Sequence, residues 1–464
     1  MSKIKVFFKT YGCQANVADS QDFAQYLLTL GVQGVDCKKD ADLVIVNTCA
    51  IREKAESKIY SYLGELVELK EPRPYMKFGV IGCVASYRKK EIFQRFDHIN
   101  FVCGAREKTR LFKTYLSKLV QEIIQSKQDF ESGKTKTFSG RQDRDMEAFI
   151  KSSIQKETLP VKAVKEICKK PELKRAMINI MTGCNNYCTY CIVPFTRGRE
   201  RSYPFESIVE RVRGEVEVGA KEITLIGQNV NSYKDPVSQK SFPELLEAVA
   251  KIPGDFWIRY VSPHPKDITR ELLDVMAKYP KKVCPAIHFP LQSGSTKILQ
   301  AMNRTYSAEK FMDGVKMIRE VLFKATISTD IIVGFPGETE EDYLATRDVM
   351  EKSRFDMVYS FIYSPRKYTK AAEMTDECPD EVKTKRLMEL QERAREMSRE
   401  QHEKLVDDVV VRVLVEGRLS GGKLWGKTAG NVRVRFNGPD EAIGTFVNVK
   451  IVAAQCAYVE AEGV

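Results

Sequence analysis

Two series of alternating strand and helix patterns, separated by a polar stretch, constrain the fold of this chain more than any other feature. In the first series, short β-rich apolar runs alternate with segments of helical spacing. Such alternation favours a parallel sheet with helices on both faces. The sequence therefore predicts a doubly wound α/β domain, with strands at 4–9, 43–46, 78–81 and 99–102 and helices at 19–30 and 52–69.

The second series begins at Arg175 and contains six strand candidates separated by helical stretches. Six βα units in succession predict a partial, open relative of the eight-stranded barrel. The highly charged helical segment 383–405 is interpreted as a solvated helix that closes this domain. The strand candidates are 176–181, 222–226, 257–261, 286–289, 326–333 and 357–363.

The last part of the chain has short alternating runs instead of βα units. A Gly-Gly turn at 421–422 lies among strand candidates at 409–415, 432–436 and 445–453. This pattern predicts a small antiparallel β-barrel. The predicted domains are 1–125, 173–400 and 401–464, with a linker at 126–172.

Composition restricts the compartment and the chemistry of the cysteines. There is no apolar run of about 18 residues, and the first apolar stretch is too short for a signal peptide, so we expect a cytoplasmic chain without membrane contact. Thiols stay reduced there, and the 12 cysteines are then metal ligands, redox groups or buried side chains instead of disulfides. The net charge of +11 suggests an acidic partner such as nucleic acid, although this signal alone is weak.

Three cysteines, Cys184, Cys188 and Cys191, lie within eight residues directly after the first strand of the second series. Loops at the carboxyl ends of barrel strands hold the active sites of such folds. Closely spaced thiolates bind iron-sulfur clusters, and three of them leave one iron of a 4Fe-4S cluster open to substrate or cofactor. A structural zinc site is the alternative, but zinc usually takes four ligands and no fourth Cys or His lies nearby.

Three further cysteines follow strand candidates of the first series. Cys13, Cys49 and Cys83 each lie two to four residues beyond a predicted strand. In a doubly wound sheet these positions gather at one edge, so the three thiols could bind a second ligand. The alternative is three small buried side chains, which is common for cysteine. Cys103 also follows a strand candidate and fits the same edge, so the residues alone leave the choice open.

The C-x3-C-x2-C motif and its flanks, GCNNYCTYCIVPFTRGRER at 183–201, resemble the radical S-adenosylmethionine superfamily and, within it, the methylthiotransferase family. The resemblance covers nearly the whole chain. Its other motifs are TYGCQAN at 10–16, VNTCAIRE at 46–53, GC at 82–83, GQNVNSY at 227–233, LQSGS at 291–295, MNRTY at 302–306 and GFPGET at 334–339.

This resemblance implies two 4Fe-4S clusters with separate roles. It implies that the cluster on Cys184, Cys188 and Cys191 generates a radical from S-adenosylmethionine, which unassisted side chains cannot do. A second cluster would carry the sulfur that is methylated and delivered, and two S-adenosylmethionine molecules would be used per product. Cys103 then has no ligand role. The implied ligands of the second cluster are Cys13, Cys49 and Cys83, and the residues implied to line the S-adenosylmethionine site are Gln228, Asn229, Gln292, Ser293 and Asp330.

The resemblance also implies a substrate. CAIRE at 49–53 and GQNVNSY match the branch that adds a methylthio group to C2 of N6-isopentenyladenosine next to the anticodon of tRNA. The sister enzymes, which act on threonylcarbamoyladenosine or on a ribosomal protein aspartate, are the alternative. A non-catalytic RNA-binding iron-sulfur protein is a third hypothesis, and the intact three-cysteine motif argues against it.

The expected partners are the anticodon stem-loop and an electron donor such as flavodoxin or ferredoxin, and the chain is expected to be a monomer. The C-terminal barrel resembles a small RNA-binding module, and the basic loop 197–201 is expected to contact phosphates. Aromatic side chains of the barrel either stack on bases or fill its core. The barrel residues considered for RNA contact are Lys423, Trp425, Lys427, Arg433, Arg435 and Phe436.

Overall fold

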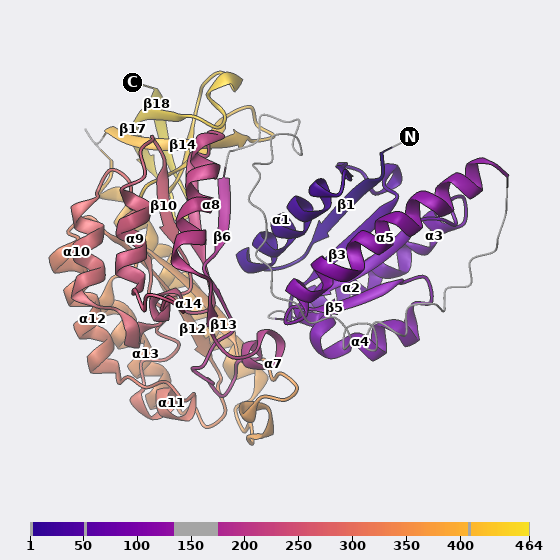
Figure 1. Cartoon of the computed structure of the whole chain (residues 1–464). Helices are drawn as coiled ribbons and strands as arrows, with labels where there is room; N and C mark the ends of the chain where they lie inside the picture. The colour runs from indigo at the N-terminus through magenta and orange to yellow at the C-terminus, as the bar shows by residue number, and fades with distance from the viewer. Residues whose placement is uncertain (1–2, 51–52, 134–174, 407–409, 464) are drawn as a thin grey trace. The chain divides into compact units, whose positions relative to one another are not determined.

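The computed structural model describes residues 3–50, 53–133, 175–406 and 410–463, and it divides into two compact units (Figure 1). The first unit takes in the described residues of 1–168 together with 182–184 and 192–200, and the second takes in those of 169–181, 185–191 and 201–464. Most of the predicted linker at 126–172 lies outside the described residues. No helix in the part of the chain that is described is long and apolar enough to cross a membrane.

The first unit is a five-stranded parallel sheet in the order β2-β1-β3-β4-β5, with helices on both faces. The central strand, β3, is buried at every position, because apolar clusters cover the sheet on both sides. The predicted doubly wound domain is confirmed. Its elements are β1 (Lys5–Thr10), α1 (Gln14–Thr29), β2 (Gln33–Gly34), η1 (Lys38–Asp40), β3 (Leu43–Thr48), α2 (Glu53–Glu65), α3 (Val67–Lys70), β4 (Lys77–Gly82), α4 (Cys83–Arg95), β5 (Phe101–Gly104) and α5 (Lys108–Glu131), and α7 (Val193–Arg197) also belongs to this unit.

The larger part of the second unit is the predicted partial barrel of parallel strands. Two three-stranded sheets, β10-β9-β6 and β11-β12-β13, are joined in series by a parallel bridge between Ile258 and Val283. Figure 1 shows helices α8 to α13 along the outside of these strands. One large apolar cluster fills the space between the strands and the helices.

The bounds of its elements follow the predicted series closely. The strands are β6 (Arg175–Asn179), β7 (Met181–Thr182), β8 (Arg201–Ser202), β9 (Glu222–Ile226), β10 (Trp257–Tyr260), β11 (Ala286–His288), β12 (Thr326–Val333) and β13 (Met357–Ile362). The helices are α8 (Phe205–Glu217), η3 (Val230–Ser232), α9 (Phe242–Ala250), η4 (Pro265–Asp267), α10 (Arg270–Lys278), α11 (Thr296–Ala301), α12 (Ala308–Val321), α13 (Glu340–Ser353), η5 (Lys370–Glu373) and α14 (Asp380–Glu403).

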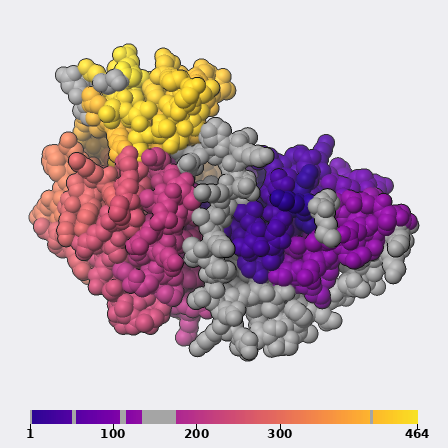
Figure 2. All heavy atoms as spheres, turned by 45° about the horizontal axis from the view of Figure 1, so that its top comes forward, coloured from indigo at the N-terminus to yellow at the C-terminus, as the bar shows by residue number. Residues whose placement is uncertain are grey.

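A closed five-stranded barrel in the order β14-β15-β16-β18-β17 completes the second unit. The predicted barrel is confirmed, but it is not antiparallel throughout, because β16 and β18 pair in parallel. It packs on the amino ends of the parallel strands, where the Arg259 guanidinium donates to the carbonyls of Thr428 and Ala429, each at 2.8 Å. Figure 2 shows this barrel in yellow as a cap on the pink and orange domain. Its elements are β14 (Val410–Arg418), β15 (Leu424–Thr428), β16 (Arg433–Phe436), η6 (Asp440–Ala442), β17 (Phe446–Ala454) and β18 (Val459–Gly463).

Candidate functional site

Three cysteines lie just beyond the carboxyl ends of the three central strands of the first sheet. Cys13 follows β1 and is the N-cap residue of α1, Cys49 comes directly after β3, and Cys83 follows β4 as the first residue of α4. Cys49 and Cys83 are buried, and Cys13 is partly exposed. This is the edge at which doubly wound sheets bind their ligands.

Two glycines let the loops that carry these cysteines approach each other closely. Gly12 has φ +142°, and a Cβ atom built on it would lie 2.6 Å from Cβ of Cys49. Gly82 has φ +98°, and a Cβ atom there would lie 2.4 Å from Oδ1 of Asn47. Both backbone conformations and both contact distances exclude larger residues, so the sequence motifs need glycine immediately before Cys13 and Cys83.

Hydrogen bonds of two buried amide side chains connect the same loops. Asn16 Nδ2 donates to Asn47 Oδ1 at 2.8 Å and to the Thr48 carbonyl at 2.7 Å, and Asn47 Nδ2 donates back to the Asn16 carbonyl at 2.8 Å. Thr48 Oγ1 donates to the Ile81 carbonyl at 2.6 Å, which ties the end of β3 to β4. These hydrogen bonds join α1 to the end of β3 and β3 to β4, and they fix the positions of the loops relative to one another.

The thiols at this edge are close enough to affect each other's ionisation. A hydrogen bond with Cys49 is the main reason that the pKa of Cys13 is lowered to about 6, and the positive charge of Arg197 lowers it further. Burial raises the pKa of Cys83, against the effect of the Arg197 charge. The thiolate is the form that binds metal, and this environment favours it at Cys13.

Arg197 is therefore a component of the cysteine edge and not a surface residue. Its Nη2 donates to Asp19 Oδ2 at 2.9 Å, and both residues are buried, with 7 % and 5 % of their surface exposed. The prediction that Arg197 contacts substrate phosphates is wrong, because its guanidinium is paired inside the first unit. Arg199 and Arg201 are exposed, and their contact with RNA stays a prediction.

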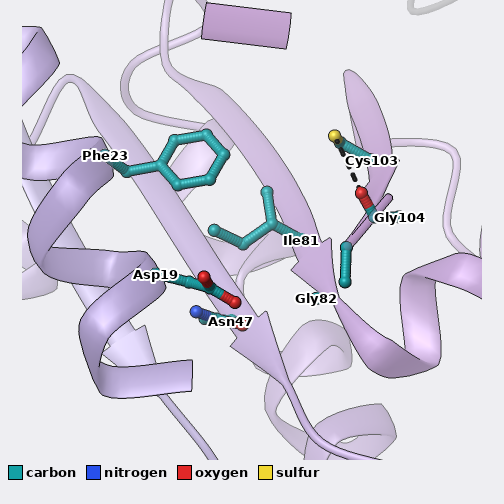
Figure 3. A pocket seen from close by; sticks show the side chains of 8 residues that line it. Asp19, Phe23, Asn47, Ile81, Gly82, Cys103 and Gly104 are labelled. Carbon is teal, nitrogen blue, oxygen red and sulfur yellow. Dashed lines mark hydrogen bonds between the residues drawn. The ribbon is translucent and has the colours of Figure 1, made fainter. Parts of the chain in front are cut away.

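Cys103 differs from the other three cysteines in position and surroundings. It lies inside β5, is 1 % exposed and packs in the apolar cluster between the sheet and α1 and α5. Its thiol is 3.4 Å from the Gly104 carbonyl. Figure 3 shows it beside a small pocket, on the far side of Ile81 from Asp19. These surroundings account for Cys103 as a core side chain.

The donor set at this edge consists of thiols. Among the described residues, no group of three or more His, Cys, Asp or Glu side chains is placed to hold a single metal ion. A 4Fe-4S cluster takes each thiolate on a different iron, so its ligands stand further apart. An all-thiol set also selects soft metals over Mg²⁺ or Ca²⁺.

The second set of cysteines lies on the loop between β7 and α7. Cys184 belongs to the first unit, where its N–H donates to the Gly198 carbonyl at 3.1 Å. Cys188 and Cys191 belong to the second unit, and the Cys191 N–H donates to the Cys188 carbonyl at 2.9 Å. Their neighbours explain the MNRTY motif: Asn303 Nδ2 donates to the carbonyls of Asn186 and Tyr187, each at 3.0 Å.

Four of the residues expected at the S-adenosylmethionine site follow strands of the partial barrel and Asp330 lies within β12, and their side chains differ in exposure. Asn229 is 1 % exposed, and its amide is taken by Asp267 and by the His264 N–H. Gln228 directly before it is partly exposed. The amide of Asn229 therefore shapes the loop, whereas Gln228 lies nearer to solvent.

Gln292 and Ser293, which are also expected at the S-adenosylmethionine site, lie after β11. Ser293 is fully buried and within 3.3 Å of the Thr346 hydroxyl, so its side chain joins this loop to α13. Gln292 has φ +69°, and its backbone pairs with β12 through the Asp330 carbonyl at 2.8 Å. Such a strained non-glycine backbone is held by its surroundings and is frequent at functional sites.

Asp330 has a partner that sequence reasoning missed. His288 Nε2 on β11 is 3.1 Å from Asp330 Oδ2 on β12, and His288 Nδ1 is 3.1 Å from the Ser328 hydroxyl. Strand β12 alternates between partly exposed and buried positions, so Ser328 and Asp330 face the same side. The alternation along β12 could have predicted from the sequence that these polar side chains lie on the same face of the strand.

Comparison with known protein families finds a matching family model for each of the three domains. The model of the radical SAM superfamily matches residues 178–350, that of an uncharacterized protein family, UPF0004, matches 5–104, and that of the TRAM domain matches 409–464. These matches correspond to the partial barrel, the doubly wound sheet and the closed barrel.

Curated relatives resemble the chain along its whole length. A tRNA-2-methylthio-N(6)-dimethylallyladenosine synthase of Carboxydothermus hydrogenoformans is 39% identical, with 99% of each chain covered. One of Thermodesulfovibrio yellowstonii is 40% identical over 96% of this chain and 95% of its own.

Among solved structures, the radical S-adenosylmethionine methyltransferase TsrM from Kitasatospora setae has a TM-score of 0.56, covering 80% of this chain and 75% of that chain. Its sequence identity is 13%, so this likeness concerns the fold alone.

Proposed function

The chain belongs to the tRNA-2-methylthio-N(6)-dimethylallyladenosine synthase family of radical S-adenosylmethionine enzymes, and we propose that it adds a methylthio group to C2 of N6-isopentenyladenosine next to the anticodon of tRNA. The observation that carries this proposal is identity of 39% spread over 99% of the chain, which includes all three domains and both sets of cysteines. We assign the reaction to the cytoplasm, where its tRNA substrate is used.

Both sets of cysteines are proposed as cluster ligands. Cys184, Cys188 and Cys191 would hold the radical SAM cluster on one short loop, and the thiols at the edge of the first sheet would hold the second. When bound, the first cluster and S-adenosylmethionine supply the electron and the carbon radical that side chains cannot. The support for the second site is the all-thiol donor set, the close approach at Gly12 and the pKa of Cys13. Its proposed ligands are Cys13, Cys49 and Cys83.

The proposed S-adenosylmethionine site lies along the carboxyl ends of β9, β11 and β12. Gln228 and Asp330 have partly exposed side chains that can hydrogen-bond to the cofactor, and Asp330 is oriented by His288 at 3.1 Å. Asn229, Gln292 and Ser293 would act mainly by fixing the backbone around them, since their side chains are buried.

RNA contact is proposed for the outer surface of β15 and β16. Register pairs Trp425 with Arg435 and Lys427 with Arg433 on one face of the two strands. Burial beside Glu416 and Arg259 lowers the pKa of Lys427, so the residues proposed for RNA contact are Trp425, Arg433 and Arg435. Arg433 lies over the Trp425 ring at 5.4 Å, an arrangement that suits a base and its phosphate. Phe436, by contrast, is 3 % exposed and fills the barrel core.

The other residue considered there, Lys423, is held at 2.8 Å by Glu460 and contributes less free charge. We further propose that the chain acts as a monomer and receives electrons from a small reductant such as flavodoxin or ferredoxin. The anticodon loop is single-stranded, so the target base is reached without opening a duplex.

The decisive experiment offers the anaerobically reconstituted protein three anticodon stem-loops, with unmodified, isopentenylated or threonylcarbamoylated adenosine. Mass spectrometry of the nucleosides should show a methylthio product only from the isopentenylated RNA. Turnover confined to the threonylcarbamoylated RNA would assign the chain to a sister activity. No turnover of any of the three, with both clusters present, would contradict an RNA substrate of this class.

A further inference from the structure

A buried arginine, Arg304, contacts one of the cysteines of the C-x3-C-x2-C loop. Its Nη1 donates to Cys188 Sγ at 3.5 Å, its Nε to the Tyr306 hydroxyl at 3.1 Å and its Nη2 to the Pro290 carbonyl at 3.4 Å. Only 7 % of Arg304 is exposed. Three fixed contacts define the plane of the guanidinium, so its orientation toward the sulfur is set by the fold.

The charge of Arg304 has no carboxylate to balance it among the residues that the structure describes. Tyr306 is an uncharged phenol at neutral pH. The His264 ring contacts the Tyr306 ring edge-on, with 5.7 Å between the ring centroids. Burial lowers the pKa of His264 to about 2, and the Arg304 charge adds to this effect, so His264 is a neutral imidazole. A buried cation without a negative partner is strongly unfavourable.

The contact with Cys188 shows what the partner is. A cysteine that binds an iron-sulfur cluster does so as a thiolate, and the cluster with its thiolates carries negative charge. Arg197 at the other set of cysteines provides the contrast, because Asp19 neutralises it at 2.9 Å. The two sets therefore differ in charge: the arginine beside Cys188 keeps a full positive charge, whereas Arg197 is paired with Asp19.

We propose that Arg304 is a positioning residue for the radical SAM cluster, and that its N–H···S hydrogen bond and unneutralised charge raise the reduction potential of that cluster. The inference rests on the proposed function, since it takes Cys184, Cys188 and Cys191 as the ligands. One-electron reduction by flavodoxin or ferredoxin adds one negative charge to the cluster. A cation held beside a ligand sulfur stabilises that reduced form, and hydrogen bonds to sulfur tune such potentials.

The test measures this potential with only one cluster present. In full-length protein carrying Cys13→Ala, Cys49→Ala and Cys83→Ala, iron analysis should give about four iron atoms per chain. This background is then combined with Arg304→Gln, with Arg304→Lys or with the control Arg270→Gln. Arg270 is exposed on α10 and paired with Asp274 at 3.1 Å. Each protein is titrated with dithionite and mediators, and the reduced cluster is followed by electron paramagnetic resonance.

We expect Arg304→Gln to lower the ratio of reduced to oxidised cluster at a fixed potential about tenfold, which is about 59 mV for a one-electron couple. Arg304→Lys keeps the charge but loses the planar set of three donors, so it should shift the potential in the same direction by less. Arg270→Gln should leave it unchanged. The shape of the reduced signal should also change in Arg304→Gln, because the hydrogen bond to Cys188 is lost.

Failure of this proposal and failure of the proposed function are distinguishable. A background protein without iron would show that the ligand assignment is wrong. Full iron content with the same potential in both Arg304 variants and the control would overturn the role of Arg304 alone. Weaker S-adenosylmethionine binding at an unchanged potential would overturn it too, and would assign the guanidinium to the cofactor carboxylate. If Arg304→Gln holds no iron, an unchanged potential in Arg304→Lys is the contradicting result.

Discussion

Arg197 and Asp19 form a buried ion pair with 2.9 Å between Nη2 and Oδ2, although 178 residues separate them in the chain. Arg197 ends α7, shortly after the C-x3-C-x2-C motif, and Asp19 lies on α1, shortly after Cys13. The charge of Arg197 also acts on the thiols of Cys13 and Cys83. The segment after one cysteine motif is thus a structural part of the other cysteine site.

Breaking this pair should destabilise the first unit. Arg197→Gln removes the cation that pairs with the buried Asp19 carboxylate, and breaking a buried ion pair in this way costs about 3–5 kcal/mol. The double variant Arg197→Gln/Asp19→Asn should lose less than the single one, because neither charge remains. Both tryptophans, Trp257 and Trp425, lie in the second unit, so their fluorescence does not report this change.

A suitable probe is the thiol of Cys103, which is 1 % exposed inside the first sheet. Its alkylation rate in mild urea, measured by mass spectrometry, gives the free energy of opening of this unit. Equal rates in Arg197→Gln and in the unchanged protein would show that the ion pair contributes nothing to stability.

The cysteine assignment predicts iron content and product separately. The unchanged protein should bind about eight iron atoms, and replacing Cys184, Cys188 and Cys191 by Ala should leave about half. Cys13→Ala, Cys49→Ala or Cys83→Ala should abolish the methylthio product while formation of 5′-deoxyadenosine persists. Cys103→Ala is the matched control and should be nearly silent. An inactive Cys103→Ala protein beside an active Cys83→Ala protein would reverse the choice of ligands.

Gly12→Ala tests whether close approach of the loops forms the second site. The new Cβ atom would lie 2.6 Å from Cβ of Cys49 at φ +142°, so the Cys13 and Cys49 loops must separate. We expect loss of about half the iron with retention of S-adenosylmethionine cleavage. Gly31→Ala is the control, since Gly31 also has positive φ, +79°, but has open space around its Cβ position. Full iron in Gly12→Ala would argue against this geometry.

The sequence predicted the strands best within the regular series of alternating strands and helices. The strands expected at 222–226 and 326–333 have the same bounds in the structure, because their burial comes from the regular βα pattern. Strands β2, β15 and β18 are among those that were missed. β2 has two residues, Gly426 interrupts β15, and β18 carries Glu460 and Glu462, so only the tertiary pairing of the sheet and of the closed barrel makes them strands.

For the candidate sites too, some features could be predicted from the sequence and others could not. That thiols follow strand ends could be predicted, because the carboxyl edge of a parallel sheet is fixed by topology. The burial of Arg197 could not be predicted, since a basic run in a loop looks solvated until its distant partner Asp19 is known. The pairing of His288 with Asp330 depends likewise on which strands become neighbours.

His264 should make the stability of the second unit depend on pH. Its pKa is lowered to about 2 in the folded protein, mainly by burial, and Nδ1 accepts the Lys266 N–H at 3.3 Å, which requires a neutral ring. The unfolded chain binds a proton near pH 6.5, so this contribution to stability is present above 6.5 and is lost as pH falls. The loss at pH 5.5 is about 1.4 kcal/mol.

His264→Asn keeps an acceptor for Lys266 and removes the titration. The difference in unfolding free energy between pH 7.5 and 5.5, followed by tryptophan fluorescence, should therefore be about 1.4 kcal/mol smaller in the variant. Identical pH dependence in both proteins would mean that His264 is protonated in the folded state.

The outer surface of β15 and β16 should supply much of the affinity for tRNA, and point variants test this better than removal of the barrel. The barrel accepts hydrogen bonds from Arg259, which also pairs with Glu222 at 2.7 Å, so deletion would expose buried charges of the neighbouring domain. Arg433→Gln should weaken binding and reduce the slope of log K against log salt by about 0.7–0.9, as expected for one lost phosphate contact.

Trp425→Ala should weaken binding about tenfold, whereas Trp425→Phe retains a stacking surface. Cleavage of S-adenosylmethionine should be unchanged in all three. If the salt slope of Arg433→Gln equals that of the exposed control Arg270→Gln, the RNA lies on another face of the barrel.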